Sequence, residues 1–116
     1  MLLILLFFFS LFAFPYGMRR EYGRTVGWRC ERCGKSFFDG WLIEFHHKLP
    51  TNAGGLDTWD NIEALCTEDH YYAHVDLRKQ GLDHPYSAQI VYARLQQTCG
   101  GRTREWLEKN RDRVLA

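Results

Sequence analysis

EFHHKLPTNAGGLDTWDNIEALCTEDHYYAH, residues 44–74, is the stretch that decides the fold of this chain. Four of the five histidines lie in it, as two pairs on either side of Asn61: His46 and His47, then His70 and His74. The second pair has the spacing i and i+4, which puts both side chains on one face of a helix. The stretch therefore predicts a site where imidazoles gather.

Two short strands are predicted around a loop. Alternating apolar and polar residues predict a strand over residues 41–45, with His46 and His47 at its end. Residues 48–60 contain Pro50 and two adjacent glycines, which indicates a loop. Residues 62–65 are predicted to form the second strand.

Three helices are expected after the second strand. Thr67 is expected to cap a helix that runs to about residue 80, with acidic residues in its first turn. Two further helices are predicted, one opening at Asp83 and ending at the Gly100-Gly101 pair, and one over residues 103–115. Residues 18–28 are expected to form an irregular lead-in.

The four histidines can supply both the metal ligands and the general base of a hydrolytic metal site. His70 and His74 can share one cation, and His46 at the strand end is the candidate third ligand. Three neutral imidazoles leave coordination positions open for a phosphate oxygen and water. Because neighbouring strand residues point to opposite faces, His47 is free to act as a general base. Asn61 can hold a histidine or a loop carbonyl in place.

The cysteines indicate a second metal site. The chain has four cysteines, Cys30, Cys33, Cys66 and Cys99, which would form two disulfides if it were secreted. The Cys30-x-x-Cys33 spacing and the later Cys66-x-x-Asp69 favour zinc ligation in a reducing compartment instead.

Taken together, these residues resemble the HNH endonuclease motif of the ββα-metal, or His-Me finger, nucleases. The resemblance covers roughly residues 30–80, and the histidine spacing is similar to that of nuclease colicins. It implies an α+β fold: a small, treble-clef-like ββα-metal core with a zinc knuckle, followed by two additional helices. It also implies roles for individual residues, namely metal ligation by His46, His70 and His74, general base His47, orienting residue Asn61 and a supporting carboxylate at Glu44.

The cysteine pattern resembles a different branch of the family, the McrA-like and phage HNH proteins, in which four cysteines hold a structural zinc. This chain has Asp69 where the fourth cysteine would fall. A carboxylate can ligate zinc, so Cys30, Cys33, Cys66 and Asp69 are the expected set. Two alternatives remain open: Cys99 as the fourth ligand, or a weak, degenerate site.

Length and charge set the domain organisation. At 116 residues the chain has room for one domain, expected over residues 18–116. Residues 1–17 are largely apolar. They are interpreted as a membrane anchor, a signal-like segment or the result of a start codon assigned upstream of the true one, and as irrelevant to the fold.

The net charge is only +1, but basic residues gather near the N-terminus. Four of them are expected to contact DNA phosphates: Arg19, Arg20, Arg24 and Arg29.

The expected function is that of a metal-dependent DNA endonuclease, which nicks one strand per active site. It would use one catalytic divalent cation (Mg²⁺, Mn²⁺, Ni²⁺ or Zn²⁺) and a structural Zn²⁺. Double-strand cleavage would need a homodimer or two encounters. A cytoplasmic location is expected, with membrane association through residues 2–14 left open. The rival readings are a non-catalytic zinc module that binds nucleic acid or protein and, ranked last, a toxin nuclease.

Overall fold

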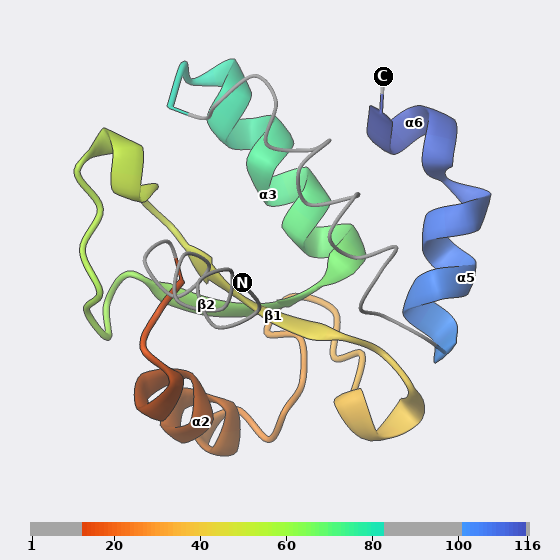
Figure 1. Ribbon diagram of the computed structural model, residues 1–116, viewed down its shortest axis with the longest axis horizontal. Helices are drawn as coiled ribbons and strands as arrows, with labels where there is room; N and C mark the ends of the chain where they lie inside the picture. Colours follow the sequence, from red (N-terminus) through yellow and green to blue (C-terminus); the bar gives the residue numbers. More distant parts are fainter. Residues whose placement is uncertain (1–12, 83–100, 116) are drawn as a thin grey trace, which may run out of the picture.

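The computed structural model describes residues 13–82 and 101–115. Its elements follow one another as α2 (Tyr16–Thr25), η1 (Phe37–Asp39), β1 (Ile43–His47), η2 (Thr51–Ala53), β2 (Ile62–Cys66), α3 (Thr67–Lys79), α5 (Gly101–Lys109) and α6 (Arg111–Leu115). The α+β class and the ββα order of β1, β2 and α3 are confirmed (Figure 1). The helix predicted to open at Asp83 and the residue Cys99 lie outside the described residues.

The sheet consists of β1 and β2, paired antiparallel from Ile43 with Cys66 to His47 with Ile62. Both strands were predicted, but β1 begins two residues later than expected and includes both histidines. The bounds of β1 are set by its pairing with β2, and the alternation of apolar and polar residues within β1 does not indicate where that pairing begins or ends. Side chains alternate along β1: Glu44 and His46 contact His70 of α3, whereas Phe45 packs against Tyr22 of α2 and His47 against Phe14.

Helix α3 follows β2 without a connecting loop. The residue that caps it is Cys66, whose Sγ accepts a hydrogen bond from the Asp69 amide at 3.5 Å. The expectation of a Thr67 cap is therefore wrong, because Thr67 is already the first helical residue and Cys66 keeps the extended backbone that a cap requires. The helix ends near Gly81, whose φ of 72° is left-handed.

The N-terminal lead-in is helical over Tyr16–Thr25, which corrects the expectation of irregular structure for most of residues 18–28; residues 26–28 form a turn. Its glycines were interpreted as breaks, yet Gly23 lies inside α2, where the absence of a side chain leaves room for the indole of Trp28. A Cβ there would lie 2.3 Å from the Trp28 ring. Phe14, from the segment expected to be irrelevant to the fold, is only 1% exposed.

Two apolar clusters hold these elements together. One surrounds the hairpin and contains Ile43, Leu65 and Ala73, with Tyr22 and Phe45 packed against it. The other cluster joins α3 to α5 and α6, and its members are Leu107, Val114, Leu42, Tyr71 and Trp106. The single helix predicted over residues 103–115 is in fact these two helices.

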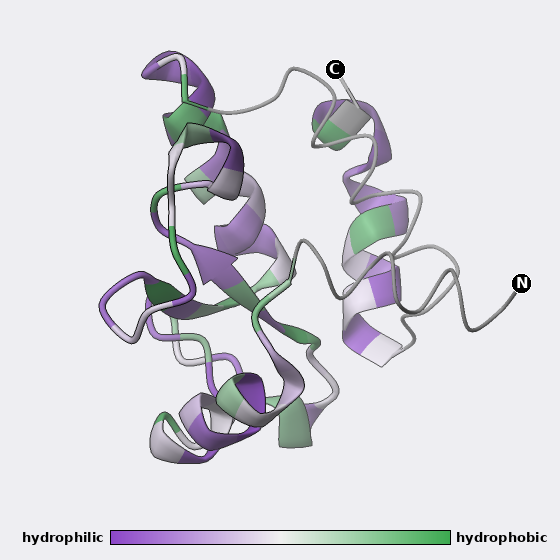
Figure 2. Ribbon diagram, turned by 60° about the vertical axis from the view of Figure 1, so that its left-hand side comes forward, coloured by the Kyte–Doolittle hydropathy of each residue, from purple (hydrophilic) through white to green (hydrophobic). Residues whose placement is uncertain are grey.

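A buried hydrogen bond fixes the start of α5 against the hairpin. Thr103 is fully buried, and its hydroxyl accepts from the Leu42 amide at 2.7 Å. Hydrophilic residues make up much of α2 and α5 (Figure 2). Within residues 13–82 and 101–115, the helices are too short or too polar to cross a bilayer.

Candidate functional site

Three histidines converge between β1 and α3. His46 lies on the strand face that looks toward α3, and His70 and His74 lie one turn apart on that helix. Their ring centroids are between 4.6 and 5.1 Å apart, and one nitrogen of each ring lies within 4.8 Å of the others. His46 and His70 are buried and His74 is partly buried. The structure thus brings together the three histidines that the sequence singled out as ligands.

The donor set fits one cation. Nε2 of His70 and Nε2 of His74 are 3.0 Å apart, close to the ~3.3 Å expected for two nitrogens bound to one tetrahedral ion. Burial, and then the neighbouring His70 and His74, lower the pKa of His46 from 6.5 to about 2. His46 is therefore neutral at physiological pH and keeps the lone pair that a ligand needs.

Glu44 supports this cluster from β1. It is buried, and its carboxylate is bonded to Nδ1 of His70. A carboxylate on Nδ1 fixes the tautomer and turns Nε2 toward the cluster, which is the arrangement that orients metal-binding histidines.

His47 lies on the other side of β1. Its ring stacks on Phe14, with centroids 3.7 Å apart and planes 9° apart. Its Nε2 lies 2.8 Å from Oδ1 of Asp57, and the side chain is 11% exposed. His47 thus does not join the three-histidine cluster, and it makes its own contacts with an aromatic ring and a carboxylate.

Asn61 closes the loop between the strands. Its Oδ1 accepts from the Leu49 amide at 2.8 Å, and its Nδ2 donates to the carbonyls of Leu49 and Leu56 at 3.1 and 2.9 Å. The Asn61 carbonyl also accepts from the Lys48 amide at 2.9 Å. Asn61 was expected to bond either a histidine ring or a loop carbonyl. Its side chain bonds the loop backbone.

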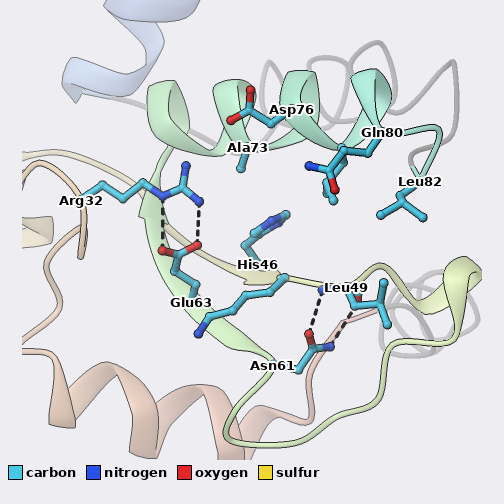
Figure 3. A pocket seen from close by; sticks show the side chains of 11 residues that line it. Arg32, His46, Leu49, Asn61, Glu63, Ala73, Asp76, Gln80 and Leu82 are labelled. Atoms are coloured by element: carbon cyan, nitrogen blue, oxygen red, sulfur yellow. Dashed lines mark hydrogen bonds and ion pairs between the residues drawn. The ribbon is translucent and has the colours of Figure 1, made fainter.

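A pocket of about 580 Å³ opens beside His46. Figure 3 shows the Arg32–Glu63 ion pair along one side and Asn61 bonded to the Leu49 backbone along another. Lys48 and Gln80 also line it. The pocket offers room for a substrate next to the histidine cluster, with two basic side chains in its wall.

Sequence reasoning missed several of these residues. Lys48 and Asp57 lie in the loop between His47 and Asn61, so their position next to predicted site residues was the available signal. Gln80 follows Ala73 and Leu77 at helical spacing and faces the same pocket. No local pattern indicates that Phe14 packs on His47.

A second cluster lies where the loop after α2 meets the start of α3. The ligand atoms of Cys30, Cys33, Cys66 and Asp69 all lie within 4.8 Å of one another. Cys33 Sγ is 3.6 Å from Cys66 Sγ, close to the ~3.8 Å between two thiolates bound at 2.3 Å to a tetrahedral zinc. Asp69 Oδ2 lies 3.1 Å from Cys30 Sγ and 3.4 Å from Cys66 Sγ. The four residues expected to hold zinc are therefore assembled around one point.

The chemistry of this cluster suits a cation. Burial raises the pKa of the Cys66 thiol. Burial would also raise the pKa of Asp69, but hydrogen bonds from the three thiols outweigh it and the pKa is lowered. The three cysteines are free rather than paired in disulfides. A bound cation would compensate the charge of buried thiolates, which burial alone disfavours.

The predicted DNA-binding arginines lie away from the histidine cluster. Arg19, Arg20 and Arg24 belong to α2, on the opposite side of the hairpin from α3 (Figure 1). Arg29 follows the helix and donates to the Gly34 carbonyl at 3.4 Å. The structure brings Arg32 and Lys48, rather than these four, to the pocket beside His46.

Part of the chain is similar to known proteins. Residues 30–76 match the HNH endonuclease family. The type IV methyl-directed restriction enzyme EcoKMcrA of Escherichia coli (strain K12) is 46% identical over 50 residues. That match covers 39% of this chain and only 18% of the enzyme. No solved structure matches the chain.

Proposed function

Because residues 30–76 match the HNH endonuclease family, we propose that this protein is a metal-dependent endonuclease that hydrolyses DNA phosphodiester bonds. The observation that carries the proposal is the cluster of buried His46 and His70 with partly buried His74, in which Glu44 is bonded to the outer nitrogen of His70. Placing three imidazoles against one another, two of them buried, is costly unless they share a ligand.

His46, His70 and His74 would hold the catalytic cation. When bound, a divalent ion at this site would stabilise negative charge that develops on the phosphate and the leaving oxygen. Imidazole donors suit Ni²⁺ and Zn²⁺ better than Mg²⁺, which prefers oxygen ligands. Mn²⁺ remains a candidate because such sites are selected by metal availability as well as by affinity.

His47 would act as the general base, and Asn61 would hold the loop that follows it. His47 is adjacent to a proposed ligand but points to the other face of β1, so it can accept a proton from the attacking water. One base and one cation cleave one strand at a time, so the expected product is a nick. A double-strand break would need a second encounter or a second copy of the chain.

The cysteine cluster would hold a structural zinc through Cys30, Cys33, Cys66 and Asp69. It joins the turn after α2 to the end of β2 and the first turn of α3, the helix that carries two of the proposed catalytic ligands. Zinc there would stabilise the fold and leave no position open for chemistry. Free thiols of this kind fit a reducing compartment, the cytoplasm.

The arginines of α2 and Arg29 would contact DNA phosphates outside the cleavage site. The place of α2 on the far side of the hairpin from α3 suits a role of its three arginines in affinity rather than in chemistry. Phosphate contacts of this kind carry no sequence information.

A plasmid-nicking assay with the full chain tests the proposal. Supercoiled DNA should be converted to the open circular form, cleavage should stop when a chelator is added, and Mn²⁺, Ni²⁺, Zn²⁺ or Mg²⁺ should restore it. His70→Ala protein purified in the same way controls for contaminating nucleases. Absence of nicking with every metal would reject the proposed activity.

A further inference from the structure

The loop between β1 and β2 holds His47 through a carboxylate that the motif does not include. Asp57 Oδ1 lies 2.8 Å from His47 Nε2, and Phe14 covers one face of the ring with its plane 9° from that of the imidazole. The His47 side chain is 11% exposed, whereas that of Asp57 is 45% exposed. The ring is therefore restrained at one nitrogen and on one face.

We propose that Asp57 is a positioning residue for His47 in phosphodiester hydrolysis, an inference that rests on the proposed nuclease function. An ionised carboxylate only accepts hydrogen bonds, so Nε2 of a neutral His47 must carry the hydrogen. The lone pair is then on Nδ1, and this nitrogen is the one that takes a proton. Asp57 thus decides which nitrogen of His47 is the base.

In the reaction, the oxygen of water forms a bond to phosphorus while its proton moves to Nδ1 of His47. The bond from phosphorus to the leaving oxygen breaks, and that oxygen takes a proton from solvent. His47 then carries a positive charge until it returns its proton to solvent. Asp57, beside Nε2, stabilises this charge without becoming protonated itself.

The backbone around Asp57 is fixed by Asn61. Nδ2 of Asn61 donates to the carbonyl of Leu56, the residue before Asp57, at 2.9 Å. Gly55 allows the loop to close, because a Cβ there would lie 1.8 Å from the Leu49 carbonyl oxygen. A chain of contacts therefore runs from Asn61 through the Leu56 carbonyl and Asp57 to His47. Asn61 would orient the base through this chain rather than by direct contact.

The test compares Asp57→Asn and Asp57→Glu with Asp60→Asn in the full chain. Asp60 lies in the same loop and bonds Thr58, so its substitution makes the same charge change without touching His47. At saturating metal, Asp57→Asn should lower kcat for plasmid nicking by roughly 10- to 1,000-fold with little change in KM, because a positioned base loses its tautomer. Asp57→Glu, which keeps the carboxylate, should recover part of that loss, and Asp60→Asn should nick at the wild-type rate.

A second readout does not depend on cleavage. Two-bond ¹H–¹⁵N correlation spectra of the imidazoles, with His47 assigned through His47→Ala, should show the Nε2–H tautomer in the wild type and a loss of that preference in Asp57→Asn. Calorimetric titration should give all three variants the wild-type Ni²⁺ affinity.

The possible failures can be told apart. If the wild type nicks DNA and Asp57→Asn nicks equally well, or if His47 is the Nδ1–H tautomer, the role of Asp57 is rejected while the nuclease proposal stands. If the wild type does not nick with any metal, the proposed function fails and the inference fails with it. A loss of Ni²⁺ affinity in Asp57→Asn would instead make Asp57 part of the metal site.

Discussion

Glu44 and His70 are bonded through a carboxylate oxygen and Nδ1, across the contact between β1 and α3. Both residues are buried, and they come from elements separated by the loop and by β2. The bond fixes which nitrogen of His70 faces His46 and His74. The strand therefore contributes to the proposed metal site twice, through a ligand at His46 and through the carboxylate that orients another.

Glu44→Gln should weaken binding of the catalytic cation. The amide keeps the size of the side chain but removes the charge that supports His70, and losses of this kind are roughly 10- to 100-fold in metal affinity. Calorimetric Ni²⁺ titration measures the effect. Glu63→Gln is a matched control, because the Glu63 carboxylate forms an ion pair with Arg32. A wild-type Ni²⁺ affinity in Glu44→Gln would mean that Glu44 has no part in metal binding.

Cys30→Ser should impair folding rather than chemistry. A structural zinc contributes folding free energy, so loss of one ligand should release zinc and lower the melting temperature by roughly 10 °C or more. Zinc content and thermal unfolding are measured on the same samples. An unchanged melting temperature, with no zinc in the wild type, would reject the cysteine cluster as a zinc site.

Position 69 tests the unusual fourth ligand. Asp69→Asn should lower zinc affinity because a neutral amide replaces the carboxylate, whereas Asp69→Cys should keep or increase it by completing a four-thiolate site. Competition with a chromophoric chelator measures both. If Asp69→Asn binds zinc as tightly as the wild type, the fourth ligand lies elsewhere.

Acid should destabilise the metal-free protein through His46. Its pKa is lowered in the folded state, so between about pH 6.5 and pH 2 the unfolded chain binds the proton that the folded chain excludes. The resulting stability is present above pH 6.5 and is lost as the pH falls. One such proton corresponds to about 1.4 kcal/mol per pH unit. Urea unfolding of chelator-treated protein from about pH 7 to pH 4 should show a shallower pH dependence in His46→Asn than in the wild type.

Much of the site follows from spacing, because its parts are local. The i and i+4 histidines on α3 and the Cys66-x-x-Asp69 turn depend on neighbours in sequence, and the structure gathers their side chains as expected. The strand that carries His46 also forms, but with bounds shifted by two residues. The resemblance implied Glu44, which periodicity alone does not select. The helix α2, the burial of Phe14 and the Asp57 contact depend on tertiary packing: Trp28 on Gly23, and two distant segments meeting at His47. No window of sequence contains that information.

His46 and His47 are adjacent in sequence, but their substitution should impair different properties: metal affinity for His46 and cleavage rate for His47. Comparing the two variants tests the central claim most directly. Calorimetric metal titration and nicking rates are measured for His46→Ala and His47→Ala, with His70→Ala and His74→Ala beside them. The account predicts that His47→Ala binds the cation as the wild type does while cleavage falls by roughly 10²–10⁴-fold. The other three variants should lose metal affinity together. Four variants that bind metal and nick DNA at the wild-type rate would contradict the account.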